Sequence, residues 1–137
     1  MSGADPGLYG TPGDVHAEVA TVRAIYDAFA RRDIEGMLQH VAEDCEMDVP
    51  TQAMAGRTEP YRGPDGVRQY FADSERVWAE LTLYAEDIRA AADGVVVFGH
   101  VEGLHRGERM ARRVVWVWEL RDGKAVRVRA NDLGDVE

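Results

Sequence analysis

Apolar residues recur at helical spacing soon after the chain begins. The first five are separated by steps of 4, 3, 4 and 3: Val15, Val19, Val22, Tyr26 and Phe29. This spacing predicts one apolar stripe along about five helical turns, with Asp14 as a suitable N-cap. Arg31 and Arg32 suit the carboxyl end of this helix because cations interact favourably with the helix dipole there.

A second, shorter helix follows almost without a loop. Asp33 can cap it, and its apolar positions are Ile34, Met37, Leu38 and Val41. Residues 45–49 then alternate with period two and end at Pro50, which predicts a short strand. Residues 50–64 contain three Pro and two Gly, so we expect a long loop.

A third helix is predicted from Pro64 to Trp78. Pro64 suits its first turn, and its helically spaced positions are Val67, Tyr70, Phe71, Ser74, Val77 and Trp78. Four strand-like segments follow, at residues 81–91, 95–104, 110–120 and 125–131, separated by turns that contain Gly94, Gly107 and Gly123. The class is therefore α+β, with three N-terminal helices packed on one face of a curved, mainly antiparallel sheet.

Alternation along the strands predicts which side chains face the helices. Val114, Trp116 and Trp118 share one face of their strand, and Val128 and Ala130 share one face of the last strand. In residues 95–104 both faces carry apolar side chains, so the inward face stays undecided. A second apolar face needs a cover, and a second copy of the same sheet would supply it, so we expect a homodimer.

Length and charge narrow the classes of function. The 137 residues fit a single soluble domain, residues 14–137, after a flexible tail at 1–13. The formal net charge of −9 makes nucleic acid an unfavourable partner. The sequence contains no apolar run long enough to span a membrane and no signal-peptide pattern, so we expect a cytoplasmic protein. The lone Cys45 excludes an intrachain disulfide. No metal-ligand cluster and no glycine-rich nucleotide motif is present, so we expect neither metal nor cofactor.

At this point the chain resembles the NTF2-like superfamily, and within it the SnoaL-like branch. The resemblance spans about residues 15–132, and four segments carry it: Ala24–Ile34 (AIYDAFARRDI), Tyr61–Val67 (YRGPDGV), Gly103–Glu108 (GLHRGE) and Trp116–Val126 (WVWELRDGKAV). It implies a cone-shaped α+β barrel, usually dimeric, whose open end holds a small apolar ligand. Members include ketosteroid isomerases, limonene-epoxide hydrolases and polyketide cyclases, so the fold alone does not define a reaction.

The resemblance suggests candidate catalytic residues. Asp48 lies near the place where the isomerases carry a proton-shuttling carboxylate before a proline, but Val49 separates it from Pro50, and a one-residue slip reverses the face. It is either a base in an apolar cone or an exposed strand-end residue. Tyr26 lies within one residue of the isomerases' oxyanion tyrosine, and it is either a donor to a ligand oxygen or a core tyrosine. The isomerases' second oxyanion acid falls at Trp116, which argues against steroid isomerisation.

A second candidate group comes from the strands. His100 and Glu102 project to the same face of their strand. The limonene-epoxide hydrolases, which this chain resembles, carry an Arg and an Asp at these two places. The final-strand Asp of those hydrolases is replaced by Ala130, and Asp132 is the available substitute. The alternatives are a surface or interface hydrogen bond for the His100 pair and a frayed chain end for Asp132.

The sequence thus predicts a pocket for a small, largely apolar molecule. Its expected lining includes Phe29, Phe71, Trp78, Glu102, Val114, Trp116, Trp118, Val128 and Ala130. Two classes of function stay open. One is cofactor-free acid–base chemistry, an isomerisation, cyclisation or hydration in which Asp48, Tyr26, His100 and Asp132 take part. The other is a non-catalytic ligand-binding or dimerisation module.

Overall fold

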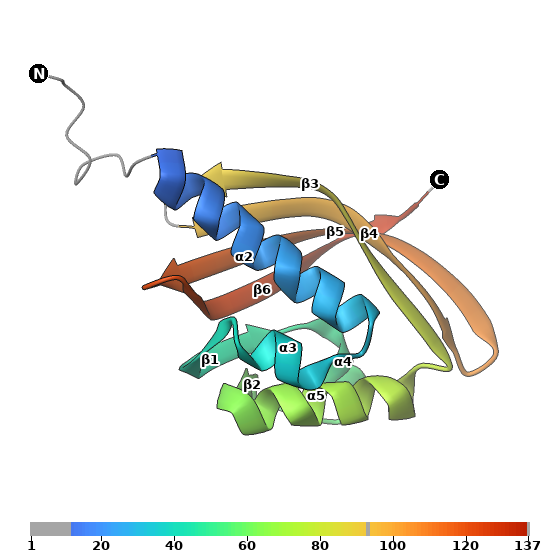
Figure 1. Cartoon of the computed structure of the whole chain (residues 1–137). Coiled ribbons are helices and arrows are strands. Elements are labelled where there is room, and N and C mark those ends of the chain that lie inside the picture. The colour runs from blue at the N-terminus through green and yellow to red at the C-terminus, as the bar shows by residue number, and fades with distance from the viewer. Residues whose placement is uncertain (1–11, 93, 137) are drawn as a thin grey trace, which may run out of the picture.

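The fold is an α+β cone in which helices cover the concave face of one curved sheet (Figure 1). The computed structural model describes residues 12–92 and 94–136. Its helices are α2 (Pro12–Ala30), α3 (Ile34–Leu38), α4 (Pro50–Met54) and α5 (Gly63–Val77). Its strands are β1 (Val41–Asp48), β2 (Tyr61–Arg62), β3 (Glu80–Ala91), β4 (Gly94–His105), β5 (Glu108–Arg121) and β6 (Lys124–Asp135). The predicted fold class is confirmed.

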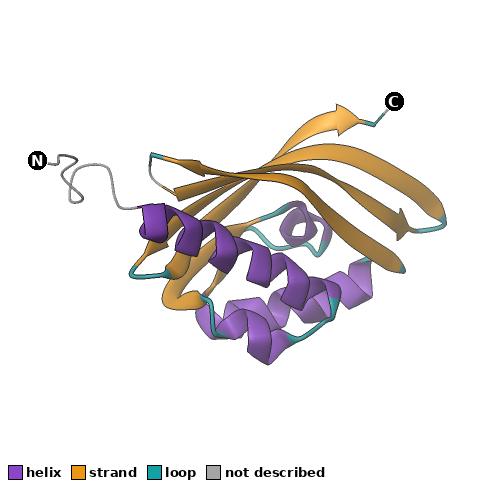
Figure 2. Cartoon of the chain, turned by 45° about the horizontal axis from the view of Figure 1, so that its top comes forward, coloured by secondary structure: helices purple, strands orange, loops and turns teal. Residues whose placement is uncertain are grey.

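The sheet has six strands in the order β2-β1-β6-β5-β4-β3. Strands β3 to β6 form the expected antiparallel meander, whereas β1 pairs parallel to β6 and antiparallel to β2. Figure 2 shows α2 running across the hollow of the sheet, with α5 on the side of β1. Because the strands curve around α2, the apolar stripe of that helix meets the inward faces of the meander.

The helices differ in detail from the sequence expectation. The first begins at Pro12, two residues earlier than expected, and the rest of the expected tail, residues 1–11, lies outside the described residues. Asp33 does cap α3, since its carboxylate accepts the backbone N–H of Gly36 at 2.9 Å. The expected loop at 50–64 contains α4, which starts at Pro50, and the two-residue strand β2. Val41, expected in the second helix, begins β1 instead, where its backbone pairs with Ala125.

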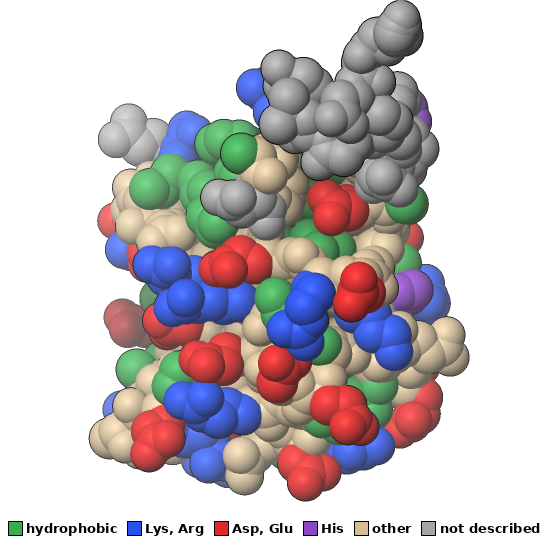
Figure 3. Space-filling view, turned by 90° about the vertical axis from the view of Figure 1, so that its left-hand side faces the viewer, with side chains coloured by type: hydrophobic (Ala, Val, Ile, Leu, Met, Phe, Trp, Pro, Cys, Tyr) green, Lys and Arg blue, Asp and Glu red, His purple; other side chains and the backbone are tan. Residues whose placement is uncertain are grey.

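The core settles which face of β4 points inward. Val95 and Val97 are buried, whereas Phe98 is 42% exposed on the opposite, convex face. Trp116, Trp118 and Val128 are buried on the inward faces of β5 and β6, as predicted. At the end of the molecule where α2 begins, acidic and basic side chains alternate over the surface (Figure 3). The negative net charge therefore forms no single-sign patch on that side.

Candidate functional site

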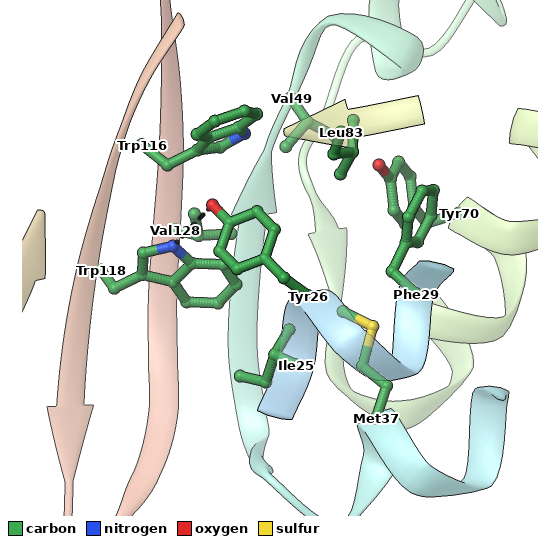
Figure 4. A pocket seen from close by; sticks show the side chains of 10 residues that line it. All are labelled: Ile25, Tyr26, Phe29, Met37, Val49, Tyr70, Leu83, Trp116, Trp118 and Val128. Atoms are coloured by element: carbon green, nitrogen blue, oxygen red, sulfur yellow. Dashed lines mark hydrogen bonds between the residues drawn. The ribbon is translucent and has the colours of Figure 1, made fainter. Parts of the chain in front are cut away.

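A small cavity lies inside the cone, between α2 and the inward faces of β5 and β6 (Figure 4). Its volume is about 30 Å³. Ten residues line it: Ile25, Tyr26, Phe29, Met37, Val49, Tyr70, Leu83, Trp116, Trp118 and Val128. All ten side chains are apolar or aromatic. The cavity is therefore lined like a hydrophobic core, and only a few polar atoms lie at its wall.

Tyr26 is the central polar group of this cavity. Its hydroxyl oxygen accepts the indole N–H of Trp118 at 3.1 Å, and its ring packs edge-on against Trp116 with centroids 5.3 Å apart. Burial raises the pKa of Tyr26 well above its usual value, although the hydrogen bond from Trp118 acts in the opposite direction. The phenol therefore stays protonated, and its own hydrogen has no acceptor among the described residues.

Trp116 supplies a second donor to the same wall. The side chain is 4% exposed, and no acceptor for its indole N–H occurs among the hydrogen bonds of the described residues. Figure 4 shows the Trp116 nitrogen and the Tyr26 oxygen on neighbouring rings at one side of the cavity. On the opposite side, burial raises the pKa of Tyr70 to about 12, so this phenol is also protonated at neutral pH. The wall thus offers N–H and O–H groups and no charged side chain.

Four of the nine expected lining residues and the candidate catalytic residue Tyr26 line the cavity, and the other expected lining residues lie elsewhere. Tyr26, Phe29, Trp116, Trp118 and Val128 line it. Phe71, Trp78 and Val114 are buried in the surrounding core and Ala130 is half-buried, and none of them lines the cavity. The sequence reasoning missed the lining residues Ile25, Met37, Val49, Tyr70 and Leu83, although Met37 and Tyr70 occupy apolar helical positions that could have indicated them.

Asp48 does not point into the cone. Its side chain is exposed, and the next residue, Val49, lines the cavity instead. The preceding residue, Met47, is buried, so alternation along β1 turns Asp48 outward and the chain then bends into α4. Asp48 therefore does not point inward, as a catalytic base in this cavity would have to.

His100 and Glu102 lie on the convex face, outside the cavity. The His100 ring stacks on Tyr84 with centroids 4.4 Å apart, and its Nδ1 and Nε2 lie 3.3 and 3.1 Å from carboxylate oxygens of Glu86 and Glu102. Burial lowers the pKa of His100, but the hydrogen bonds to Glu86 and Glu102 outweigh it, so the pKa is raised. The expectation that Glu102 lines the pocket is wrong, because even-numbered β4 residues face outward.

Asp132 belongs to an ion pair at the far end of β6. Its carboxylate accepts from Arg112 at 3.0 Å and from the backbone N–H of Gly134 at 2.8 Å. Burial raises its pKa, but these hydrogen bonds outweigh burial and lower the pKa below the usual range. Asp132 does not line the cavity. The structure therefore does not bring Asp48, His100 and Asp132 together with Tyr26.

The described residues contain no other obvious chemical centre. They hold no group of three or more His, Cys, Asp or Glu side chains placed to bind a metal ion. Cys45 is buried, and burial together with Asp44 and Glu46 raises the pKa of its thiol to about 12, so it is not a reactive thiolate. No helix in the described part of the chain is long and apolar enough to cross a membrane.

An α+β cone with an apolar interior is the class of protein that this geometry defines, and comparison with known proteins identifies the family. The model of the SnoaL-like domain matches residues 22–128, so the chain belongs to the SnoaL-like domain family. No curated protein sequence matches the chain.

Solved structures agree with this assignment. An NTF2-like protein of unknown function from Burkholderia pseudomallei is 25% identical, with a TM-score of 0.76 over 85% of this chain and 90% of that one. TerC, co-crystallised with polyporic acid, is 30% identical, with a TM-score of 0.75 over 85% and 91%. A candidate polyketide cyclase from Xanthomonas campestris is 21% identical, with a TM-score of 0.68 over 85% and 90%, and supports the fold alone.

Proposed function

We propose that the protein binds a small, largely apolar molecule that carries a hydrogen-bond acceptor, such as a ketone. The observation that carries this proposal is the pair of donors that two buried side chains hold at the cavity wall, the Tyr26 hydroxyl and the Trp116 indole N–H, for which no acceptor occurs among the hydrogen bonds of the described residues. A carbonyl oxygen would satisfy both donors, whereas a pure hydrocarbon would leave them unpaired at a cost of about 1–3 kcal/mol each. The crystal structure of TerC with polyporic acid supports a ligand in this fold.

Binding without catalysis is the function that the cavity supports better. No Asp, Glu or His is among its lining residues, so a bound ligand has no general base within the cavity. The protonated Tyr26 can donate a hydrogen bond but cannot accept a proton at neutral pH. Isomerisation or cyclisation would need a base at a position that Val49 occupies here.

A matched pair of probes tests the proposal. Acetophenone and ethylbenzene share a ring and a two-carbon chain, but only acetophenone has a carbonyl. We expect acetophenone to shift the Trp116 indole N–H signal in a ¹H–¹⁵N spectrum and ethylbenzene to leave it almost unchanged, while the backbone amide of Gly123, in the exposed turn between β5 and β6, serves as the internal reference. Tyr26→Phe should weaken acetophenone about tenfold and leave ethylbenzene unaffected. Equal affinity for the two probes would contradict recognition of an acceptor.

We also propose that two copies pair through the convex face of the sheet. Tyr84, Phe98 and Val117 are 40%, 42% and 36% exposed there, and Val96 and Val115 are half-buried between them. A contiguous apolar patch of this kind is typical of an interface, and twofold symmetry lets one patch cover its own copy.

Sedimentation velocity tests this pairing. We expect a dimer for the unmodified chain and a monomer for Phe98→Asp, because a carboxylate on the convex patch would lose its hydration in the interface. Ala72→Asp, an exposed position on α5, is the control and should stay dimeric. A monomeric unmodified chain at high protein concentration would contradict the proposed dimer.

A further inference from the structure

The cavity is too small for an organic ligand unless a wall moves. A volume of about 30 Å³ accommodates only one or two water molecules. Eight of the ten lining residues are buried, and only Val49 and Leu83 are half-buried. Val49 and Leu83 are therefore the lining residues most accessible to solvent, and at least one of their segments must shift when a ligand enters.

Val49 lies on a short segment that has the features of a movable one. We call residues 49–57 the lid segment; it comprises Val49, the five-residue helix α4 and the turn to Arg57. Val49 precedes α4 without a side-chain cap, and Gly56 ends the turn with φ +82°, where a side chain would be strained. Leu83, in contrast, is part of β3, which pairs with β4 along its whole length.

Two side-chain contacts fasten the lid segment to α5 and the residue that follows it. The indole N–H of Trp78 donates to Thr51 Oγ at 3.1 Å, and both side chains are buried. At the other end, Arg57 forms a two-pronged ion pair with Asp73, in which Nη2 lies 3.2 Å from Oδ1. The lid segment is thus closed by a hydrogen bond near the cavity and an ion pair near its far end.

One buried polar group destabilises the closed position of the lid segment. Gln52 Oε1, on α4, has no hydrogen-bond partner among the described residues although it is inaccessible to solvent. A buried unpaired carbonyl loses its hydration without compensation, so closure costs free energy at this residue. Opening of the lid segment would return the Gln52 amide to water. This rehydration lowers the free energy of the open state relative to that of the closed state.

We propose that residues 49–57 form the gate of the cavity, and that the Trp78–Thr51 hydrogen bond is the latch that sets how often the gate opens. The inference rests on the proposed function, because a gate matters only if a ligand enters. When the latch is released, α4 swings away from α5, Val49 leaves the cavity wall, and the space beside Tyr26 and Trp116 becomes reachable from solvent. Thr51 is then a positioning residue that never touches the ligand.

The latch can be tested first without any ligand. Thr51→Val keeps the shape of the side chain and removes the hydroxyl, whereas Thr51→Ser keeps the hydroxyl. We expect Thr51→Val to speed the hydrogen exchange of the Ala55 and Arg57 amides, which bond to Thr51 and Gln52 carbonyls, roughly five- to thirtyfold. The Ala125 amide, bonded to the His40 carbonyl away from the gate, should exchange at the unmodified rate. Thr51→Ser should behave as the unmodified chain.

Binding kinetics give the second readout. The latch closes the empty cavity, and a ligand larger than that cavity keeps the wall displaced, so Thr51→Val should raise the association rate of acetophenone, leave its dissociation rate nearly unchanged and lower Kd by the factor by which association speeds up. Gln52→Met, which removes the unpaired oxygen together with the 3.4 Å hydrogen bond from Nε2 to the Arg57 carbonyl, should slow association. An unchanged association rate in Thr51→Val, or unchanged exchange of Ala55 and Arg57, would overturn the gate. Failure of acetophenone to bind the unmodified chain would instead contradict the proposed function, while the exchange measurement would still decide the gate.

Discussion

The indole N–H of Trp118 donates to the hydroxyl oxygen of Tyr26 over 3.1 Å, which joins β5 to α2 inside the cone. Because Tyr26 uses its oxygen as an acceptor here, its hydrogen stays directed at another partner, and the residue can serve the fold and a ligand at once. The structural and functional interpretations of Tyr26, which are alternatives at the level of sequence, are therefore compatible.

Tyr26→Phe should lower stability because it leaves the Trp118 indole N–H buried without an acceptor. We expect a loss of about 1–2 kcal/mol in the free energy of unfolding, measured by urea denaturation. In a Trp118→Phe background the same change should cost less, because no donor remains to be orphaned. Tyr84→Phe, at an exposed position, is the control. Equal costs in both backgrounds would show that the hydrogen bond does not couple the two residues.

Local periodicity was sufficient to predict the parts of the fold whose side chains repeat over many residues. The stripe of α2 and the inward face of Trp116 and Trp118 follow from spacings of 3.6 and 2, and both are confirmed. The start of α4 also had a readable signal, since Pro50 occupies the first helical position. The pattern of apolar residues alone nevertheless predicts a loop, because a five-residue helix is too short to show a period.

Long-range pairing decided the features that the sequence left open. Asp48 is turned outward by the parallel register of β1 with β6, in which Asp48 pairs with Arg129, and no local pattern encodes that partner. The inward face of β4 is ambiguous in the sequence because apolar residues occupy both sides, and only the folded core, in which Val95 and Val97 are buried, resolves it. Candidate site residues on β1 and β4 were therefore the least predictable.

Asp73 should contribute a large share of acid-sensitive stability. It is 3% exposed and accepts from Arg57, Tyr61 and Arg76, and the hydrogen bond from Arg57, together with those from Tyr61 and Arg76, outweighs burial and lowers its pKa to about 2. A lowered pKa stabilises the fold above the unfolded value of about 3.9, and this contribution disappears as the pH falls from about 4 to about 2.

Asp73→Asn should therefore cost about 2–4 kcal/mol at pH 7, measured by urea unfolding. The difference from the unmodified chain should shrink steadily below pH 4. Asp65→Asn, at a fully exposed position on the same helix, is the control and should have a small effect at every pH. A cost for Asp73→Asn that is the same at pH 7 and pH 2.5 would show that the charge of Asp73 is not what stabilises the fold.

His100 should titrate above the usual histidine value of about 6.5. Both ring nitrogens face carboxylate oxygens, so both act as donors only in the imidazolium form. A raised pKa stabilises the fold at low pH, and this stabilisation is lost as the pH rises through the pKa of the folded state. NMR titration should show the raised pKa, and Glu102→Gln should bring it down. An unchanged His100 pKa in Glu102→Gln would exclude the Glu102 carboxylate as the cause of the raised pKa.

Gly103→Ala should disturb the Trp78 ring. An added Cβ would lie 2.5 Å from Trp78 Cζ3 and 3.2 Å from the carbonyl oxygen of Glu80, so the indole has to move. We expect a loss of about 1–3 kcal/mol in thermal or urea unfolding. Since the indole also holds Thr51, the Ala55 amide should exchange faster in this variant. In a Trp78→Phe background, where the benzo ring is absent, the cost should fall; an unchanged cost would place the strain elsewhere.

Val49→Asp places a carboxylate at the wall of the cavity, which the side chain of Asp48 does not reach. Val49 lines an apolar cavity, so burial should raise the pKa of the new carboxyl above about 3.9, and the charged form should destabilise the fold by about 2–4 kcal/mol at pH 7. Because a raised carboxyl pKa favours the protonated folded state, the penalty should diminish as the pH falls through that pKa. Unfolding at pH 7.5 and 4.5 measures it. Val49→Asn, which carries no charge, should cost the same at both pH values, and Asp48→Asn should cost little at either. A pH-independent penalty in Val49→Asp would mean that position 49 is open to water, and the interior would then be wet rather than apolar.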